Sequence, residues 1–284
     1  MMEIIEQQLV GKKSQETCED GIVVTNAHVA VIDGSTSKTA IRINPAESNG
    51  RYCMQLVSET IASLPSETNC SDFCNIVTDT IAKAYLHYHI DPNIIEQYPE
   101  RRLTCSAAVY SDYHREVWMI GDCQCLVDGV LYENNKPQEA VNAQKRSEYI
   151  QSHHLSADEI MKHDVGRDFI VNDIISSMKS QNKTYAVIDG TPIFMNGVKI
   201  IDVSNAREIV LATDGYPFLK PTLAESEEAL EELLRDDPML VSLYKATKGV
   251  MQGNQSFDDR AYIRFRPTTF LNKNLQKSNT NLSF

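Results

Sequence analysis

Acidic residues stand at the ends of apolar, strand-like segments throughout this 284-residue chain. They are, in order, Glu19-Asp20 before GIVV, Asp33 after VAVI, Asp122 after VWMIG, Asp214 after IVLAT, and Asp258-Asp259 before AYIRF. Carboxylates held on rigid strand ends suit the coordination of hard divalent cations, which prefer oxygen ligands. Glycine adjoins Asp33, Asp122 and Asp214, at Gly34, Gly121 and Gly215, where it lets the backbone turn sharply and lets a carbonyl or a water approach a metal.

A simpler interpretation is that Asp and Gly merely form turns where strands end. Asp189-Gly190 follows the apolar segment YAVI in the same way, and we expect it to begin an ordinary hairpin completed by Asn196-Gly197. A single acidic position therefore does not distinguish a metal ligand from an ordinary turn residue. The order of all five positions along the chain is more informative.

Hydrophobic periodicity predicts the elements that must hold these residues. Alternating segments predict strands at 21–32 (a hairpin), 103–110, 116–120, 123–127, 185–189, 198–203, 208–213 and 261–265. Helical spacing predicts helices over 51–64, 72–85 and 168–180, and a Thr222/Glu225 capping box predicts another. The polar segment 135–152 is predicted to be loop with fragments of helix. This pattern favours an α+β domain in packed layers over residues 1–265, followed by a polar tail over 266–284.

The composition is that of a globular protein, with 42% hydrophobic and 23% charged residues. The net charge of −12 opposes general nucleic-acid binding, and it fits either a solvated surface or carboxylates gathered around cations. The seven cysteines include no CxxC pair, which favours buried free thiols in a reducing compartment. The first residues lack the signal-peptide pattern, and no segment approaches the roughly 18 apolar residues of a membrane span. We therefore expect a cytoplasmic protein with no nucleic-acid or membrane partner.

The order of the acidic motifs resembles that of the metal-dependent type-2C, or PPM-type, protein phosphatases over about residues 15–265. That family shows an ED pair, a strand ending in DG, a GDS-like turn, a strand ending in SDG or TDG, and DN or DD before the last strand. The matching segments here are Glu19-Asp20, IDGST (Ile32–Thr36), GDCQ (Gly121–Gln124), ATDG (Ala212–Gly215) and FDDRAYIRF (Phe257–Phe265). The resemblance implies a four-layer αββα sandwich, in which two antiparallel sheets are flanked by helix pairs. Two helices after Asp33 and a helical pair between Asp214 and Asp258 would be compatible with it.

The resemblance also implies roles for the central residues. Asp33 would bridge two Mn²⁺ or Mg²⁺ ions, and the carbonyl of Gly34 would help to hold the second. Asp214 and Asp258 would complete the shell of the first ion. Asp33, Asp214 and Asp258 are thus the implied catalytic residues.

The outer ligands follow from the same resemblance. Glu19 or Asp20 would serve the second ion, directly or through water, and Asp122 with Asp214 matches the place of a weaker third ion. Two such cations roughly 3.5–4 Å apart lower the pKa of a bridging water and clamp the phosphoryl oxygens. The implied activity is therefore hydrolysis of phosphoserine or phosphothreonine in a protein substrate.

Two positions depart from the family pattern. Ser35 stands where many members have a histidine that donates a proton, and Gln15 stands where an arginine often contacts phosphate. Side chains that could replace this arginine are Lys12, Lys13, Lys38 and Arg51. Two alternatives stay open: a phosphatase of a small metabolite, and a non-catalytic or regulatory module of the same fold. The sequence indicates no oligomeric state.

Overall fold

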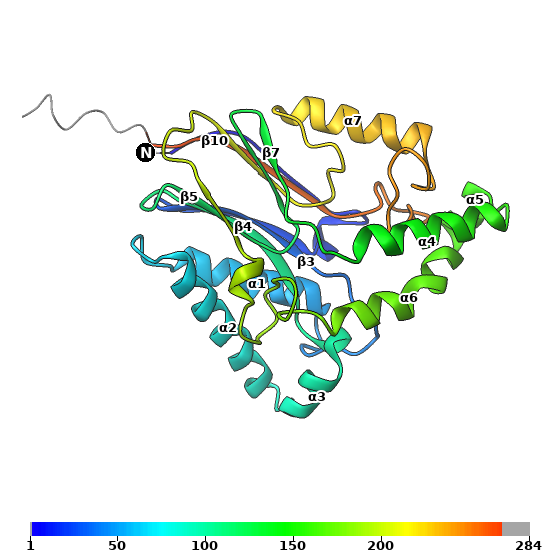
Figure 1. The fold of residues 1–284 in the computed structure, drawn as a ribbon, viewed down its shortest axis with the longest axis horizontal. Helices are drawn as coiled ribbons and strands as arrows, with labels where there is room; N and C mark the ends of the chain where they lie inside the picture. The colour runs from blue at the N-terminus through cyan, green and yellow to red at the C-terminus, as the bar shows by residue number, and fades with distance from the viewer. Residues whose placement is uncertain (1, 269–284) are drawn as a thin grey trace, which may run out of the picture.

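The computed structural model describes residues 2–268, and these form two five-stranded antiparallel sheets packed face to face (Figure 1). The first sheet has the order β1 (Glu3–Val10), β10 (Arg260–Arg266), β9 (Ile209–Ala212), β6 (Gln124–Val127) and β7 (Val130–Tyr132). The second has the order β2 (Asp20–Val24), β3 (His28–Gly34), β4 (Cys105–Ser111), β5 (Glu116–Ile120) and β8 (Lys199–Asp202). Most of the predicted tail, 266–284, lies outside the described residues.

Strand β3 shows why the sheets stack, because both of its faces are apolar. Side chains alternate across a strand, so Val29 and Val31 point to one face and Ala30 and Ile32 to the other. Val29 and Val31 belong to the core between the two sheets, whereas Ala30 and Ile32 belong to the core beneath the helices. All four are fully buried, so β3 packs tightly against the layers on both of its sides.

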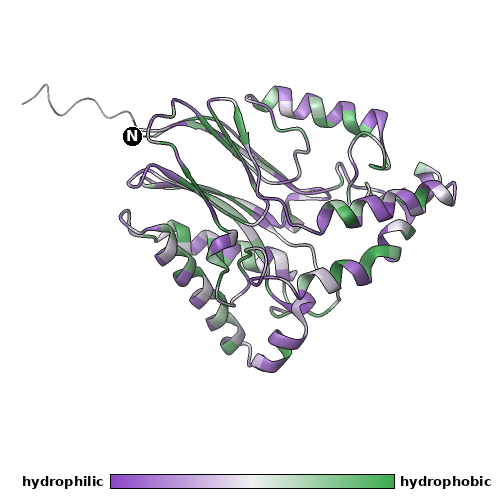
Figure 2. Cartoon of the chain, in the orientation of Figure 1, coloured by the Kyte–Doolittle hydropathy of each residue, from purple (hydrophilic) through white to green (hydrophobic). Residues whose placement is uncertain are grey.

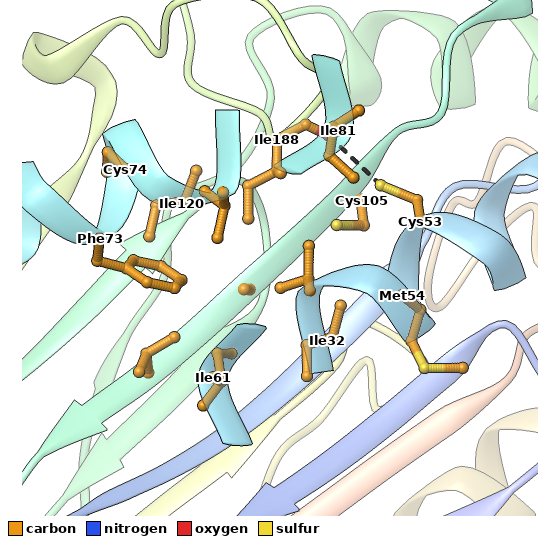
Figure 3. Packing of buried hydrophobic residues seen from close by; sticks show 14 of the residues in the cluster. Ile32, Cys53, Met54, Ile61, Phe73, Cys74, Ile81, Cys105, Ile120 and Ile188 are labelled. Carbon is orange, nitrogen blue, oxygen red and sulfur yellow. Dashed lines mark hydrogen bonds between the residues drawn. The ribbon is translucent and has the colours of Figure 1, made fainter. Parts of the chain in front are cut away.

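Helices α1 (Asn49–Ala62) and α2 (Cys70–His87) cover the outer face of the second sheet, as predicted. Their N-terminal amides are capped by side chains, since Ser48 accepts from Arg51 N and Asn69 accepts from Asp72 N. Figure 3 shows their buried side chains gathered over the sheet. Among them, the Phe73 ring stacks on Trp118 with 5.7 Å between centroids.

The outer face of the first sheet is covered by one long helix, α7 (Leu223–Asp236), and by the segment that precedes it. The predicted capping box of Thr222 and Glu225 is present. Figure 2 shows hydrophilic and hydrophobic residues alternating along α7, and its apolar side is buried through Leu230 and Leu233. Two antiparallel sheets with helices outside them confirm the α+β sandwich, although this face carries one helix of the expected pair.

Helices α4 (Glu139–Ser152), α5 (Ala157–Lys162) and α6 (Val165–Met178) lie together beyond the ends of the strands (Figure 1). The prediction of loop with fragments of helix over 135–152 is wrong, because α4 is continuous. Its buried face is mostly polar, with Asn142, Arg146 and Ser147 among its buried residues, and the last two are satisfied by hydrogen bonds rather than by apolar packing. The α4 segment therefore lacks apolar residues at helical spacing, and hydrophobic periodicity does not predict this helix. The short helix α3 (Pro92–Gln97) follows α2.

The predicted strand 185–189 is also wrong, because it contributes only isolated bridges, from Ile188 to Cys105 and from Tyr185 to Gln181. Strand β5 ends at Ile120 opposite Ala107, so only the first residues of β4 remain free on that side. The hairpin expected at Asn196-Gly197 is instead a short 3-10 turn, Met195–Gly197. No helix among residues 2–268 is long and apolar enough to cross a membrane.

Candidate active site

Three of the predicted carboxylates meet where strands of both sheets end. Asp33 ends β3, Asp122 follows β5, and Asp214 follows β9. Each offers one carboxylate oxygen, and these oxygens all lie within 4.8 Å of one another. The fold therefore brings together residues that are separated by about ninety positions in the sequence, which is the first requirement of a metal site.

Asp122 is held rigidly at this point. The preceding Gly121 has φ +87°, and a Cβ there would lie 2.2 Å from Oγ of Ser106, so only glycine fits the turn. Ser106 Oγ donates to Asp122 Oδ1 at 2.5 Å, and Lys136 Nζ lies 2.6 Å from Oδ2. Burial would raise the pKa of Asp122, but Lys136 and the hydrogen bonds outweigh it and hold this pKa below its usual value.

Asp33 and Asp214 have no such support. Within residues 2–268, no hydrogen bond or ion pair reaches the carboxylate of either residue. Burial and the charge of Asp122 raise the pKa of Asp33 to about 7. Burial and the charge of Asp33 raise the pKa of Asp214 well above its usual value. Partly buried carboxylates that repel one another and have no ion-pair partner among the described residues fit a divalent cation bound between them.

Asp20 adds to the same charge. It lies opposite Asp33 in the β2–β3 ladder, is 2% exposed, and its Oδ2 has no hydrogen-bond partner. Burial and the charge of Asp33 raise the pKa of Asp20 well above its usual value. An orphaned buried oxygen beside two unpaired carboxylates is a further sign that the residues fit a cation.

Glu19 and Asp258, also predicted as metal ligands, lie in a second cluster around Lys12. The Lys12 ammonium is 3.5 Å from Glu19 Oε2, 3.2 Å from Asp258 Oδ1 and 3.1 Å from Asp259 Oδ2. Lys248 forms an ion pair with the other oxygen of Asp258. Burial opposes ionisation of Asp258, but Lys248 and Lys12 outweigh it and hold the pKa of Asp258 far below its usual value.

Gly34 connects the two clusters. Its backbone N–H donates to the Glu19 carbonyl at 3.1 Å, and a Cβ would lie 2.4 Å from the Gly50 carbonyl oxygen. The chain can therefore approach the start of α1 only with glycine here. Glu19 is fixed at the same place, because its Oε1 accepts from Ser48 Oγ at 2.6 Å.

A pocket opens beside Asp33, Asp214 and Asp258, and five cationic side chains line it. They are Lys38, Lys136, Arg167, Lys245 and Lys248. Burial, and then the charges of Arg167, Lys248 and Lys136, lower the pKa of Lys38 to about 7. Cations crowded this closely next to a carboxylate cluster suit a multiply charged anion such as a phosphoryl group.

Of the four cations predicted as possible phosphate contacts, two lie at the site and two do not. Lys38 lines the pocket and Lys12 lies in the second cluster, whereas Lys13 is exposed and Arg51 pairs with Glu47 on α1. Five site residues were not among the predicted ligands or cations: Asp259, Lys136, Arg167, Lys245 and Lys248. Asp259 stood within the FDDR segment, but nothing in the sequence distinguished the four cations from solvated surface charges.

No family model matches this chain, and no curated protein matches it. Solved structures do match. Serine/threonine phosphatase Stp1 from Staphylococcus aureus is 13% identical over 95% of this chain and 96% of its own, with a TM-score of 0.46. The PPM Ser-Thr phosphatase MsPP from Mycobacterium smegmatis, solved with cacodylate, is 11% identical over 93% and 97%, with a TM-score of 0.46. The catalytic domain of phosphatase PstP, in complex with two manganese ions, is 13% identical over 94% and 99%, with a TM-score of 0.44.

Proposed function

We propose that this protein is a metal-dependent phosphomonoesterase that acts on phosphoserine or phosphothreonine in proteins. The observation that carries this proposal is the group Asp33, Asp122 and Asp214, whose carboxylate oxygens lie within 4.8 Å of one another beside a pocket lined by five cationic side chains. The motif order along the chain, from Glu19-Asp20 to Asp258-Asp259, supports the same activity.

Asp33, Asp122 and Asp214 would hold a Mn²⁺ or Mg²⁺ ion, because hard cations prefer carboxylate oxygens. Such an ion supplies Lewis-acid activation of water and neutralises phosphoryl charge. The carboxylates of Asp33 and Asp214, which have no hydrogen-bond or ion-pair partner within residues 2–268, would hold the ion at the rigid ends of β3 and β9.

The cations of the pocket would bind and orient the phosphoryl oxygens. Arg167 is fixed for this by donating to the Thr247 carbonyl at 2.8 Å, and Lys38 by donating to Ser35 Oγ at 3.2 Å. The Ser35 hydroxyl is a weak acid near neutral pH, so the leaving-group oxygen takes its proton from water. We place this activity in one domain over residues 1–265 of a cytoplasmic protein.

A second candidate function is hydrolysis of a small phosphorylated metabolite. The same pocket is lined by Ile174, Met178 and Phe257 as well as by the cations, and apolar walls beside a charged centre are typical of small-molecule sites.

The test compares hydrolysis of a phosphothreonine peptide, p-nitrophenyl phosphate and a panel of phosphorylated metabolites, with Mn²⁺, with Mg²⁺ and with EDTA. We expect metal-dependent turnover that Asp33→Asn and Asp214→Asn each reduce by on the order of 100-fold or more. Asp173→Asn is the control, since this exposed carboxylate pairs with Lys145 and is not among the residues that line the pocket. Peptide turnover supports the first candidate and metabolite turnover alone the second. A folded, metal-loaded protein that hydrolyses none of these substrates would contradict both and favour a non-catalytic module.

A further inference from the structure

We propose that the ammonium groups of Lys12 and Lys248 take the place of one divalent cation, so that the site binds a single ion, at Asp33, Asp122 and Asp214. The inference rests on the proposed function, and it concerns how many ions that function uses. The motif resemblance would instead place two ions here, with Asp258 and Glu19 among their ligands.

Both oxygens of Asp258 are already engaged. Lys12 Nζ lies 3.2 Å from Oδ1, and Lys248 Nζ forms an ion pair with Oδ2. The side chain of Asp258 is 10% exposed, so little solvent competes for these contacts. An incoming dication would have to displace at least one ammonium group before it could use this carboxylate.

Hydrogen bonds hold both the backbone and the side chain of Lys12 within the site. Its backbone N–H donates to Asp259 Oδ1 at 2.7 Å, and its carbonyl accepts from Gln255 N at 2.7 Å. Its ammonium also donates to Thr36 Oγ1 at 3.0 Å, in the segment that follows Asp33 and Gly34. Because backbone and side chain are both fixed, the position of the charge is set by the fold.

The two clusters differ in how many of their carboxylates are paired with an ammonium group. Glu19, Asp258 and Asp259 carry three negative charges and meet two ammonium groups, one from Lys12 and one from Lys248. In the other cluster, Asp122 pairs with Lys136, while no hydrogen bond or ion pair within residues 2–268 reaches the carboxylate of Asp33 or of Asp214. Two ammonium groups match the charge of one divalent ion. The second cluster therefore keeps one uncompensated negative charge, whereas the first, with three carboxylates and the one ammonium group of Lys136, keeps two and is left to bind a cation.

The exchange has a chemical consequence. An ammonium group is a point charge with three N–H donors and has no open coordination position. Lys12 and Lys248 can therefore neutralise and hydrogen-bond a phosphoryl group, but they cannot act as Lewis acids. We assign charge neutralisation to these lysines, and ion binding to Asp33, Asp122 and Asp214.

The test counts bound Mn²⁺ and does not depend on turnover. Equilibrium dialysis with elemental analysis gives the number of ions per chain, and electron paramagnetic resonance separates an isolated Mn²⁺ from a spin-coupled pair. We expect one isolated ion in the wild-type protein. Lys12→Gln with Lys248→Gln frees both oxygens of Asp258, so we expect two ions and a coupled spectrum. Lys145→Gln, which breaks the exposed pair with Asp173, should keep one ion.

Two bound ions with spin coupling in the wild-type protein would overturn the inference, and so would none. The wild-type count decides the matter even where the double variant fails to fold, and a folded double variant that still binds one ion also overturns it. The proposed function fails separately: a wild-type protein that binds one Mn²⁺ but hydrolyses no phosphomonoester contradicts the phosphatase and leaves the ion count intact.

Discussion

Asp20 and Asp33 lie directly opposite each other on β2 and β3, so two carboxylates with few partners are neighbours at the end of this strand pair. Directly opposed like charges destabilise a pair of strands. Burial and this mutual repulsion raise the pKa of both residues above their usual values. Without a bound cation, this pair of carboxylates lowers the free energy of unfolding, and functional sites often carry such a cost in stability.

We predict that Asp33→Asn stabilises the metal-free protein above neutral pH. The pKa of Asp33 is about 7 in the fold against its usual value of 3.8, so its ionisation destabilises the fold progressively between these two values, and the loss is complete above about pH 7. Removing the charge should raise Tm in EDTA by about 2–4 °C for each kcal/mol recovered, and more at pH 8 than at pH 6. Thermal melts at both pH values check this, with Asp173→Asn as the control. A lower Tm for Asp33→Asn at pH 8 would contradict it.

We predict that Mn²⁺ stabilises the wild-type protein much more than the variants of its carboxylates. A ligand that binds only the folded state stabilises it by about 2.7 kcal/mol at one hundred times its Kd. We therefore expect Mn²⁺ to raise the Tm of the wild-type protein and to leave Asp33→Asn and Asp214→Asn nearly unchanged. Titration of Tm against Mn²⁺ concentration measures this. Equal shifts in wild type and variants would mean that the ion binds elsewhere.

We predict that anion binding to the metal-loaded pocket weakens as pH rises from 6 to 8. Lys38 has a pKa lowered to about 7, so its charged fraction falls about tenfold over this range. Arg167, Lys136, Lys248 and Glu19 also act on Lys38, and Glu19 is the acid among them. Sulfate does not titrate in this range, so its affinity, measured by calorimetry, should fall with pH.

The variants of Lys38 identify the titrating group. Lys38→Gln should bind sulfate weakly at every pH, whereas Lys38→Arg should bind it at every pH, because guanidinium stays charged. A slope that survives in both variants would assign the titration to another residue.

We predict that Asp189→Ala destabilises the protein by about 3–5 kcal/mol without changing its metal content. Asp189 is fully buried, pairs with Arg102 at 2.8 Å, and accepts hydrogen bonds from Asn182 and Thr191. Its removal leaves the guanidinium of Arg102 unpaired in the interior. Urea unfolding gives the change in free energy, and dialysis gives the metal content. Loss of Mn²⁺ from a folded Asp189→Ala protein would contradict a purely structural role.

We predict a similar loss of stability when the buried ion pair between α4 and the start of α6 is broken. Arg146 is 0% exposed, lies 2.9 Å from Asp164 Oδ2, and donates to the carbonyls of Met239, Leu240 and Ala246. Arg146→Met leaves Asp164 without its cation, so we expect a loss of about 3–5 kcal/mol in urea unfolding. Lys145→Met is the matched control, because the exposed Lys145–Asp173 pair should contribute less than about 1 kcal/mol. Equal losses would contradict the burial argument.

Local patterns in the sequence were sufficient for much of the fold. Alternating apolar residues marked β3, β4 and β10, and the Thr222/Glu225 box marked the start of α7, because these signals depend on neighbours within a few positions. The same patterns failed for α4. Its buried Arg146 and Ser147 are satisfied by Asp164 and by carbonyls about a hundred positions away, which periodicity cannot register.

The sequence by itself determined which residue types stand at the strand ends, and it placed Asp33, Asp122 and Asp214 among the candidates for one site. Only the tertiary structure decided that these three share one point while Asp258 pairs with Lys12 and Lys248. The reason is physical. A carboxylate's partner is the nearest opposite charge in space, and the lysines reach Asp258 from a turn after β1 and from the loop before β10, whose positions the packing of the two sheets sets.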